Sequence, residues 1–292
     1  MSHDPKLRQA AIQLYDAYTH TPWSRRDFLQ RLTALVGSSS AAYALLPLLE
    51  NNYAQAANPP TDEARLRVQE GQFATLAGGA ALLGYQVQPA AAAGNVAGVV
   101  LIHENRGLNP HIRDVARRLA LAGYRVLAPD YLSTQGGTPA DEDQAREQFA
   151  RLDAGLARQI SLAAVAALRQ AGSSKVGAVG FCWGGGQAGQ LAVHAPDLQA
   201  AVVYYGPAPA SSDVAAIRAP LLLHYAGLDE RINAGVPGFT AALQAAGVRH
   251  TVHTYPGVNH AFNNDANAAR YDAAAAALAW QRTLAFLHQH LA

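Results

Sequence analysis

The sequence predicts an α/β fold with a mostly parallel central sheet and helices on both faces. Two features of the chain predict it. Short runs of apolar and β-branched residues recur along the sequence, as at 97–104, 124–132 and 175–181. Segments with helical periodicity lie between these runs, as at 111–123. Strands that alternate with helices are typical of a parallel sheet, and a strand that is apolar throughout is one whose two faces are both covered.

An antiparallel pair of strands is expected at one edge of the sheet, because 66–75 and 82–88 alternate between polar and apolar residues. The region 140–172 has helical periodicity and is long enough for two helices. Chemistry is expected at the carboxyl ends of the parallel strands, which meet at one edge of such a sheet. The further strands are expected at 198–206, 219–227 and 249–257, and the further helices at 187–194, 236–247 and 270–291.

The composition excludes several classes of function. A formal net charge of +1 with only 15% charged residues gives no basic field, so a nucleic-acid partner is not expected. The single cysteine excludes an internal disulfide and a metal site built from several thiolates. Five histidines lack the spacing of a metal-binding motif and are expected to be structural or surface residues: His103, His111, His224, His250 and His253. We therefore expect neither a metal nor a cofactor.

The first 56 residues resemble a twin-arginine export signal. The pair Arg25-Arg26 lies in the sequence SRRDFL, a mildly apolar stretch follows at 32–49, and Ala54-Gln55-Ala56 has small residues where a signal peptidase cuts. Residues 1–56 are thus predicted to be the signal and 57–292 a single mature domain, which the twin-arginine translocation machinery exports to the periplasm or the medium. The alternatives are an amphipathic helix with a chance arginine pair in a cytoplasmic protein, and an uncleaved membrane anchor.

The only cysteine lies in the pattern G-x-C-x-G at 180–184, directly after a predicted strand. A sharp turn from strand to helix strains the central residue, and the two glycines remove Cβ atoms that would clash there. The start of the following helix favours a thiolate on Cys182. Two plainer interpretations compete: a small buried thiol, and a phosphate-binding turn at 184–189. A dinucleotide site would need an acidic residue after the next strand, and that strand ends in VVYYGPAP without one.

An acid and a base follow two later strands. Asp229 follows the run 219–227, and His260 follows the run 249–257. Each has an ordinary interpretation, since Asp229 could cap the next helix and His260 could be a polar loop residue. Together with Cys182, they give a nucleophile, an acid and a base in the chain order of a hydrolase triad.

Four stretches together resemble the dienelactone hydrolase (carboxymethylenebutenolidase) family: HENRG (103–107), GFCWGG (180–185), AGLDERI (226–232) and NHAFNND (259–265). The resemblance covers nearly all of 62–292 and implies a one-domain α/β-hydrolase fold with a Cys-His-Asp triad. It implies Cys182 as the nucleophile, His260 as the base and Asp229 as the residue that orients the base. It further implies that Glu104 holds the resting thiol and helps to ionise it. The backbone N–H groups of Trp183 and Asn105 would form the oxyanion hole.

The expected activity is that of a carboxylic ester hydrolase that cleaves an ester or an enol lactone such as dienelactone through a thioester. A thiolate leaves more readily than an amine, so amides are poor substrates for such an enzyme. The best-known members bind the dienelactone carboxylate with arginines, whereas this chain has Asn264 at one of those places and no arginine at 130–134. The residues predicted to line the substrate pocket are Arg106, Tyr131, Phe262 and Asn264.

Two other functions stay open at this point. A single activated thiol in an exported chain could be redox-responsive, although no resolving cysteine accompanies it. The chain could also be a non-catalytic binding module with the same fold, because a fold alone does not determine function. The expected partner is a small-molecule ester or lactone, and the expected oligomeric state is a monomer.

Overall fold

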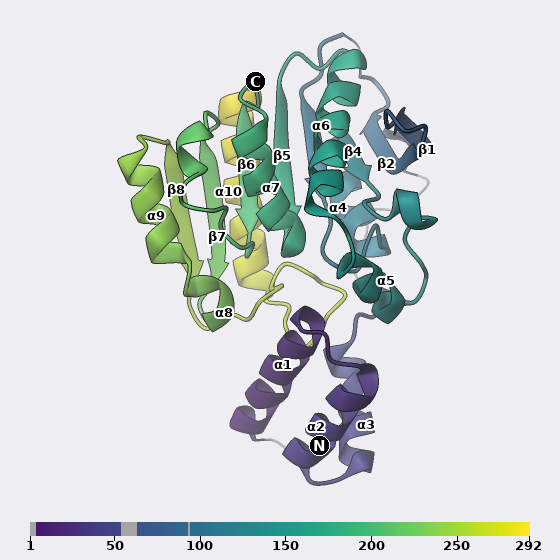
Figure 1. Ribbon diagram of the computed structural model, residues 1–292, viewed down its shortest axis with the longest axis vertical. Helices are drawn as coiled ribbons and strands as arrows, with labels where there is room; N and C mark the ends of the chain where they lie inside the picture. The colour runs from purple at the N-terminus through teal and green to yellow at the C-terminus, as the bar shows by residue number, and fades with distance from the viewer. Residues whose placement is uncertain (1–3, 54–62, 93) are drawn as a thin grey trace.

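The computed structural model describes residues 4–53, 63–92 and 94–292, which form an α/β fold around one eight-stranded sheet. The strand order is β1-β2-β4-β3-β5-β6-β7-β8 (Figure 1). Strand β2 pairs antiparallel with β1 and with β4, and every other neighbouring pair is parallel. The strands are β1 (Leu66–Thr75), β2 (Ala81–Pro89), β3 (Gly98–Ile102), β4 (Arg125–Pro129), β5 (Val176–Phe181), β6 (Ala200–Tyr204), β7 (Leu221–Ala226) and β8 (His250–Tyr255).

Helices cover both faces of this sheet and create two separate apolar cores. Helices α4 (Pro110–Leu121) and α10 (Ala273–Leu291) pack on one face. Helices α6 (Ala154–Gln170), α7 (Trp183–His194) and α9 (Val236–Ala245) pack on the other. Every residue of β3, β5, β6 and β7 is buried, which confirms that the apolar runs are strands covered on both faces. Short helices complete the domain: η1 (Ser133–Gln135), α5 (Glu142–Phe149), η2 (Val214–Ala216) and α8 (Glu230–Asn233).

The antiparallel edge pair and the two helices predicted within 140–172 are confirmed by β1, β2, α5 and α6. One boundary differs in an informative way. The helix predicted to start at Gln187 begins at Trp183, so three consecutive glycines form its first turn. Glycine disfavours helices by its own propensity, which is why the pattern predicted a late start. Close packing requires those glycines: a Cβ on Gly184 would lie 2.4 Å from the carbonyl oxygens of Ile102 and His103.

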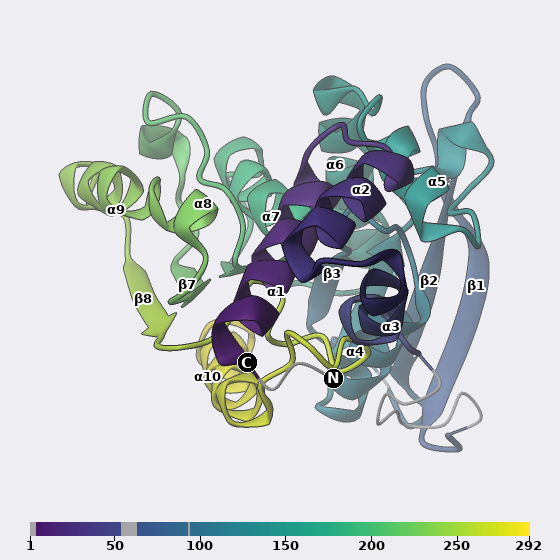
Figure 2. The same ribbon diagram turned by 90° about the horizontal axis from the view of Figure 1, so that it is seen from below.

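The N-terminal region folds into three helices, α1 (Pro5–His20), α2 (Arg25–Val36) and α3 (Ser39–Leu49). They share an apolar core of their own, in which Tyr18 stacks on Phe28 with ring centroids 4.6 Å apart. In both ribbon views these helices lie against the carboxyl ends of the parallel strands (Figures 1 and 2). The region thus covers the edge of the sheet at which chemistry is expected. We call residues 4–53 the N-terminal cap.

Polar contacts attach the N-terminal cap to the larger domain. Arg25, the first residue of the predicted export motif, forms ion pairs with Glu50 at 2.7 Å and Asp143 at 3.1 Å. At the other end of the cap, Asn267 donates its amide to the Leu49 carbonyl. The predicted cleavage site at Ala54-Gln55-Ala56 lies outside the described residues. Among the described helices, none alone has the length and hydropathy to cross a membrane; α2 and α3 reach the threshold only as a pair, and they meet at a bend of 113°.

Candidate active site

Cys182 lies in the sharp turn between β5 and α7, as the G-x-C-x-G pattern predicts. Its backbone has φ 57° and ψ −118°, a conformation that costs an ordinary residue about 1–3 kcal/mol. A Cβ on Gly180 would lie 1.9 Å from the carbonyl oxygen of Gly184, so the turn needs a glycine there. The thiol is buried at the start of α7, where the positive end of the helix dipole favours a thiolate.

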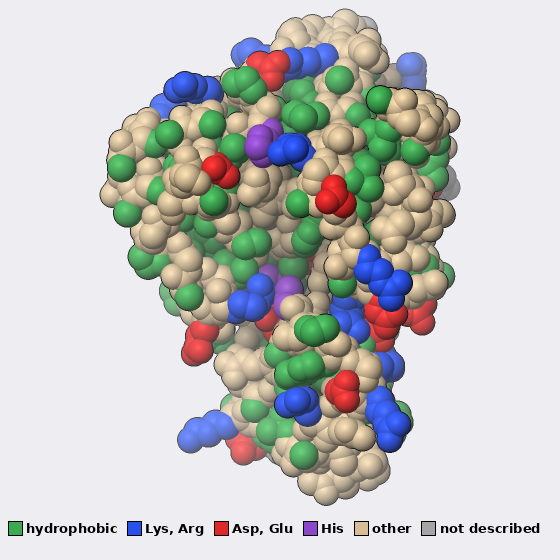
Figure 3. Space-filling view, viewed as in Figure 1, with side chains coloured by type: hydrophobic (Ala, Val, Ile, Leu, Met, Phe, Trp, Pro, Cys, Tyr) green, Lys and Arg blue, Asp and Glu red, His purple; other side chains and the backbone are tan. Residues whose placement is uncertain are grey.

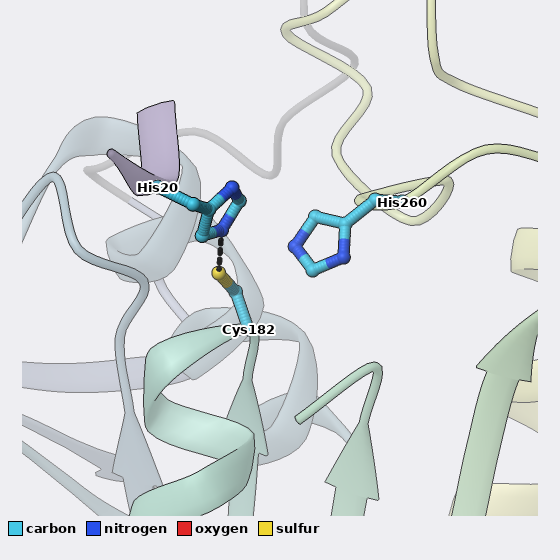
Figure 4. Close-up of side chains that lie close together, drawn as sticks. All are labelled: His20, Cys182 and His260. Carbon is cyan, nitrogen blue, oxygen red and sulfur yellow. Dashed lines mark hydrogen bonds between the residues drawn. The ribbon is translucent and has the colours of Figure 1, made fainter. Parts of the chain in front are cut away.

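His260 and Asp229 form a hydrogen-bonded pair beside this cysteine. The His260 Nδ1 donates to the Asp229 Oδ2 at 2.5 Å, and both side chains are almost completely buried. Asp229 also caps α8, because its Oδ1 accepts from the Ile232 N–H at 3.2 Å, so one carboxylate both caps the helix and contacts His260. The His260 Nε2 is buried and has no hydrogen-bond partner among the described residues. The ring directs this nitrogen toward the space beside Cys182 (Figure 4).

A third side chain, which the sequence did not indicate, contacts the sulfur. His20, the last residue of α1, places its Nε2 3.2 Å from the Cys182 Sγ (Figure 4). Its ring centroid lies 4.9 Å from that of His260. Sequence reasoning missed His20 because it lies within the predicted export signal, 162 residues before the cysteine. No motif connects the two positions in the sequence.

The two imidazoles determine the ionisation of the sulfur. Burial by itself would raise the pKa of Cys182, but the positive charges of His260 and His20 outweigh burial and lower this pKa to about 6. Burial by itself would lower the pKa of His260, but the negative charges of Asp16 and Cys182 and the Asp229 hydrogen bond raise it to about 10. The sulfur and the two imidazoles therefore favour a thiolate with one imidazolium beside it at neutral pH.

Glu104 lies in the turn after β3, buried, but its contacts differ from those the resemblance implies. Its Oε2 accepts from the Asn264 amide at 3.2 Å, and its Oε1 has no partner among the described residues. The hydrogen bond of the Cys182 sulfur goes to His20 instead. The neighbouring Asn105 uses its side-chain amide to donate to the Thr19 carbonyl of α1 at 2.7 Å. Asn105 thus connects the turn after β3 to the N-terminal cap.

A cavity of about 640 Å³ opens at the sulfur. Cys182, His260, Trp183 and Asn105 line one side of it, and the segment 19–24 of the N-terminal cap lines the other. In the space-filling view, the surface is hollowed where the cap meets the larger domain, and histidine atoms are visible there (Figure 3). A volume of this size suits a small organic substrate.

The four residues predicted to bind substrate do not line this cavity. Arg106 is buried in an ion pair with Asp143 at 3.1 Å and lines a different cavity. Tyr131 is fully buried, with its hydroxyl bonded to Ser161 at 2.7 Å. Phe262 is fully buried among aromatic rings, and Asn264 holds Glu104. The cationic side chains at the cavity come instead from Arg146, Arg151 and Arg231.

Three side chains around the sulfur, those of His20, Cys182 and His260, could together hold a metal ion. One ligand atom each from His20, Cys182 and His260 lies within 4.8 Å of the other two. Two imidazoles and a thiolate are a ligand set that suits zinc or copper. The spacing rules applied to the sequence do not detect this group, because its members come from three distant parts of the chain.

Comparisons with known proteins identify the family of the chain. The model of the dienelactone hydrolase family matches residues 82–291. An Escherichia coli O157:H7 protein with the name "Putative carboxymethylenebutenolidase" is 34% identical over 223 residues, which cover 70% of this chain and 82% of that protein. A crystal structure of a "Putative Dienelactone Hydrolase" from Klebsiella pneumoniae has a TM-score of 0.69 at 30% identity, covering 77% of this chain and 99% of its own. A dienelactone hydrolase from Anabaena variabilis has a TM-score of 0.61 at 25% identity with the same coverage of both chains. The chain therefore belongs to the dienelactone hydrolase family and is a carboxylic ester hydrolase with the α/β-hydrolase fold.

Proposed function

We propose that the protein hydrolyses esters or lactones through Cys182 as a covalent nucleophile. The observation that carries this proposal is the His260–Asp229 pair, whose unpartnered Nε2 faces the sulfur of a cysteine held in a strained strand-to-helix turn. A base, the acid that orients it and a nucleophile are the three parts that covalent acyl transfer needs.

In the first step, the Cys182 thiolate attacks the carbonyl carbon of the substrate, and a neighbouring imidazole holds the thiol proton. The carbonyl oxygen becomes an oxyanion, and the backbone N–H groups of Trp183 and Asn105 are the proposed donors to it. Loss of one such donor costs about 2.7–4 kcal/mol of barrier in related chemistry. The C–O bond then breaks, the alcohol leaves with the proton, and a thioester on Cys182 remains.

In the second step, water hydrolyses the thioester. The His260 Nε2 takes a proton from the water, and the hydroxyl attacks the thioester carbonyl. The C–S bond breaks, and the proton passes from His260 to the thiolate or to solvent. Asp229 keeps the Nδ1 proton of His260 in place, so the Nε2 is the nitrogen that can accept.

The proposed substrates are small activated esters and enol lactones. A stabilised alkoxide or enolate leaves in preference to the thiolate, whereas an amine does not, so peptides are disfavoured. Dienelactone and neutral lactones are both candidates. Arg231 lines the cavity with 41% of its side chain exposed, and it is a cation that could meet a substrate carboxylate.

The test is aryl-ester hydrolysis by Cys182→Ala. The variant is expected to keep its fold and lose activity, and near-normal turnover would reject the nucleophile. Glu104→Gln is expected to reduce the rate less than Cys182→Ala does. Titration of the single thiol before the assay separates a hydrolase, in which blocking the thiol stops turnover, from a redox-responsive protein or a binding module. A panel of lactones with and without a carboxylate then defines the substrate class.

Export by the twin-arginine pathway is a separate proposal for residues 1–56. The Arg25-Arg26 pair and the small residues at 54–56 support it. The ion pairs of Arg25 with Glu50 and Asp143 support the alternative, in which the two arginines begin an ordinary helix. The mass of the protein recovered from separate cell fractions decides between them: export with cleavage predicts a shortened chain in the periplasm.

A further inference from the structure

We propose that His20 is a second catalytic imidazole, held by Asp16, and that the N-terminal cap is consequently a part of the active site. This inference rests on the proposed function of Cys182. It assigns the first proton transfer, from the thiol, to His20, and the second, from water, to His260. Helix α1 lies outside the segment 82–291 that the family model matches, so the family resemblance does not supply this residue.

The hydrogen bonds of His20 show which of its two ring nitrogens can accept a proton from the sulfur. The Nδ1 lies 2.8 Å from the Asp16 carbonyl oxygen, which can only accept, so the Nδ1 carries a proton. In neutral His20 the lone pair is then on the Nε2, 3.2 Å from the Cys182 Sγ. One proton is shared by these two atoms. On the sulfur it gives a thiol beside an imidazole, and on the Nε2 it gives a thiolate beside an imidazolium. Both forms make His20 a base toward the nucleophile.

Asp16 places a carboxylate near the His20 Nδ1, although without the hydrogen bond that Asp229 makes with His260. Its Oδ1 lies 3.4 Å from the His20 Nδ1, one helical turn away on the same face of α1. Arg231 and Arg270 approach the same carboxylate at 3.6 Å and 3.9 Å. Burial by itself would raise the pKa of Asp16, but the positive charges around it lower this pKa, so the carboxylate stays ionised and stabilises an imidazolium.

The two imidazoles have different partners, and this difference separates their roles. The His20 Nε2 is occupied by the sulfur, whereas the His260 Nε2 is buried without a partner among the described residues. In acylation, the S–H proton passes to the His20 Nε2, the sulfur attacks, and the leaving oxygen takes that proton as the C–O bond breaks. Acylation removes the thiolate charge that helps to raise the pKa of His260, so in deacylation the His260 Nε2 can take a proton from water and return it to the sulfur as the C–S bond breaks. One ester and one water thus become one acid and one alcohol.

Contacts at the end of α1 hold His20 in this position. The Asn105 amide donates to the Thr19 carbonyl, next to His20 in the chain. Arg146 of α5 donates to the Thr21 carbonyl at 2.9 Å, just beyond the helix. Both donors belong to the larger domain, and the carbonyls that accept from them lie directly before and directly after His20 in the chain. A chain cut after Ala56 would lose His20 together with one wall of the cavity.

The test uses alkylation of Cys182 by iodoacetamide, followed by intact mass, because the only thiol in the chain gives an unambiguous product. The full-length protein is compared with His20→Gln and His20→Ala from pH 4.5 to 9, in the presence of EDTA. Removal of one imidazole is expected to move the inflection of the alkylation rate upward by about one pH unit or more. At about pH 5.5, a shift of about 1.5 units lowers the thiolate fraction more than twentyfold. A more basic thiolate is also a stronger nucleophile, which offsets part of the loss in thiolate fraction. The net loss in alkylation rate is therefore about fivefold.

Other charged or titratable groups surround the sulfur and stay unchanged in these variants. They are Asp16 on α1, Glu104 after β3, Tyr205 after β6, Asp229 and Arg231 at α8, and His260 and Arg270 after β8. The matched control is His194→Gln, at the opposite end of the same helix that begins beside Cys182. It is expected to keep the wild-type profile.

Asp16→Asn keeps the His20 ring in place, in case the His20 variants do not fold; because the Asp16 charge also raises the pKa of His260, this variant weakens the support of both imidazoles. It is expected to move the inflection in the same direction by a smaller amount. Wild-type alkylation profiles in folded His20→Gln and Asp16→Asn, with unchanged kcat/KM for an aryl ester, would overturn the inference. Failure of the proposed function gives a different result, since ester hydrolysis by Cys182→Ala would reject the nucleophile without changing the alkylation profiles.

Discussion

Arg146→Ala is the substitution that most directly tests how the N-terminal cap is held on the domain. Arg146 lies on α5 and is 7% exposed. Its guanidinium donates to the carbonyls of Thr21 at 2.9 Å, Trp23 at 3.0 Å and Tyr18 at 3.4 Å. It also lies 4.5 Å above the centre of the Tyr18 ring. The Tyr18 and Thr21 carbonyls lie at the end of α1, where carbonyls lack intrahelical donors, and the Trp23 carbonyl lies in the turn before α2.

The loss can be worked out from these contacts. A hydrogen bond with a charged donor contributes about 1.5–3 kcal/mol, and two of the three have good lengths, which gives about 3–6 kcal/mol. The contact with the Tyr18 ring adds about 0.5–2 kcal/mol. This free energy stabilises docking of the cap more than folding of the sheet, because the cap has its own core. The sum is at least about 3.5 kcal/mol, so the equilibrium for local opening of the cap is expected to rise by about 300-fold or more.

The assay is limited proteolysis at low protease concentration, with the cleavage sites mapped by mass. Arg146→Ala is expected to be cut within residues 4–53 about 300-fold faster than the wild type or more, because cleavage follows the population of the opened state. Arg151→Ala is the matched control, since Arg151 is an exposed arginine at the same cavity. Equal cleavage rates for the two variants, with equal ester turnover, would refute the account of cap docking.

Three further predictions concern the nucleophile and its partners. Gly180→Ala places a Cβ 1.9 Å from the Gly184 oxygen, so a stability loss above about 4 kcal/mol is expected in denaturant titration; Gly78→Ala, whose Cβ would meet nothing within 4 Å, should be nearly neutral. Asp229→Asn removes the acceptor of the His260 Nδ1 proton and is expected to lower kcat by about 10²–10⁴, with little loss pointing to another orienting group. Alkylation of wild-type Cys182 should fall as pH drops through about 6, where the sulfur becomes protonated; an inflection near that of a free thiol would contradict the lowered pKa.

The sequence was sufficient to predict the sheet and to place Cys182, Asp229 and His260 at one edge of it, because both depend on local patterns. The apolar runs identify strands covered on both faces, and Cys182 and Asp229 follow two such strands, whereas His260 follows the partly exposed edge strand β8. The carboxyl ends of parallel strands meet, so residues far apart in the chain are brought together without any need to know the packing.

The cavity walls could not be predicted in the same way. Arg106 follows a strand and has a suitable charge, but its direction depends on Asp143, which lies on α5. Tyr131 turns inward to bond Ser161 of α6. His20 reaches the sulfur only because α1 docks across the sheet edge, a long-range contact that leaves no periodic signal. The apolar and small residues that make 32–56 resemble an export signal include Leu32, Leu46 and Leu49, which build the core of the cap.

The most direct test of the covalent mechanism is the mass of the intact protein during turnover. Wild-type enzyme is mixed with an aryl ester that carries a bulky acyl group, quenched in acid within milliseconds, and digested for peptide mapping. The account predicts one added acyl group, located on the peptide that contains Cys182, which appears as the aryl alcohol is released and disappears as the acid forms. Release of the alcohol at the normal rate with no acyl group on Cys182, or with the group on another residue, would contradict it.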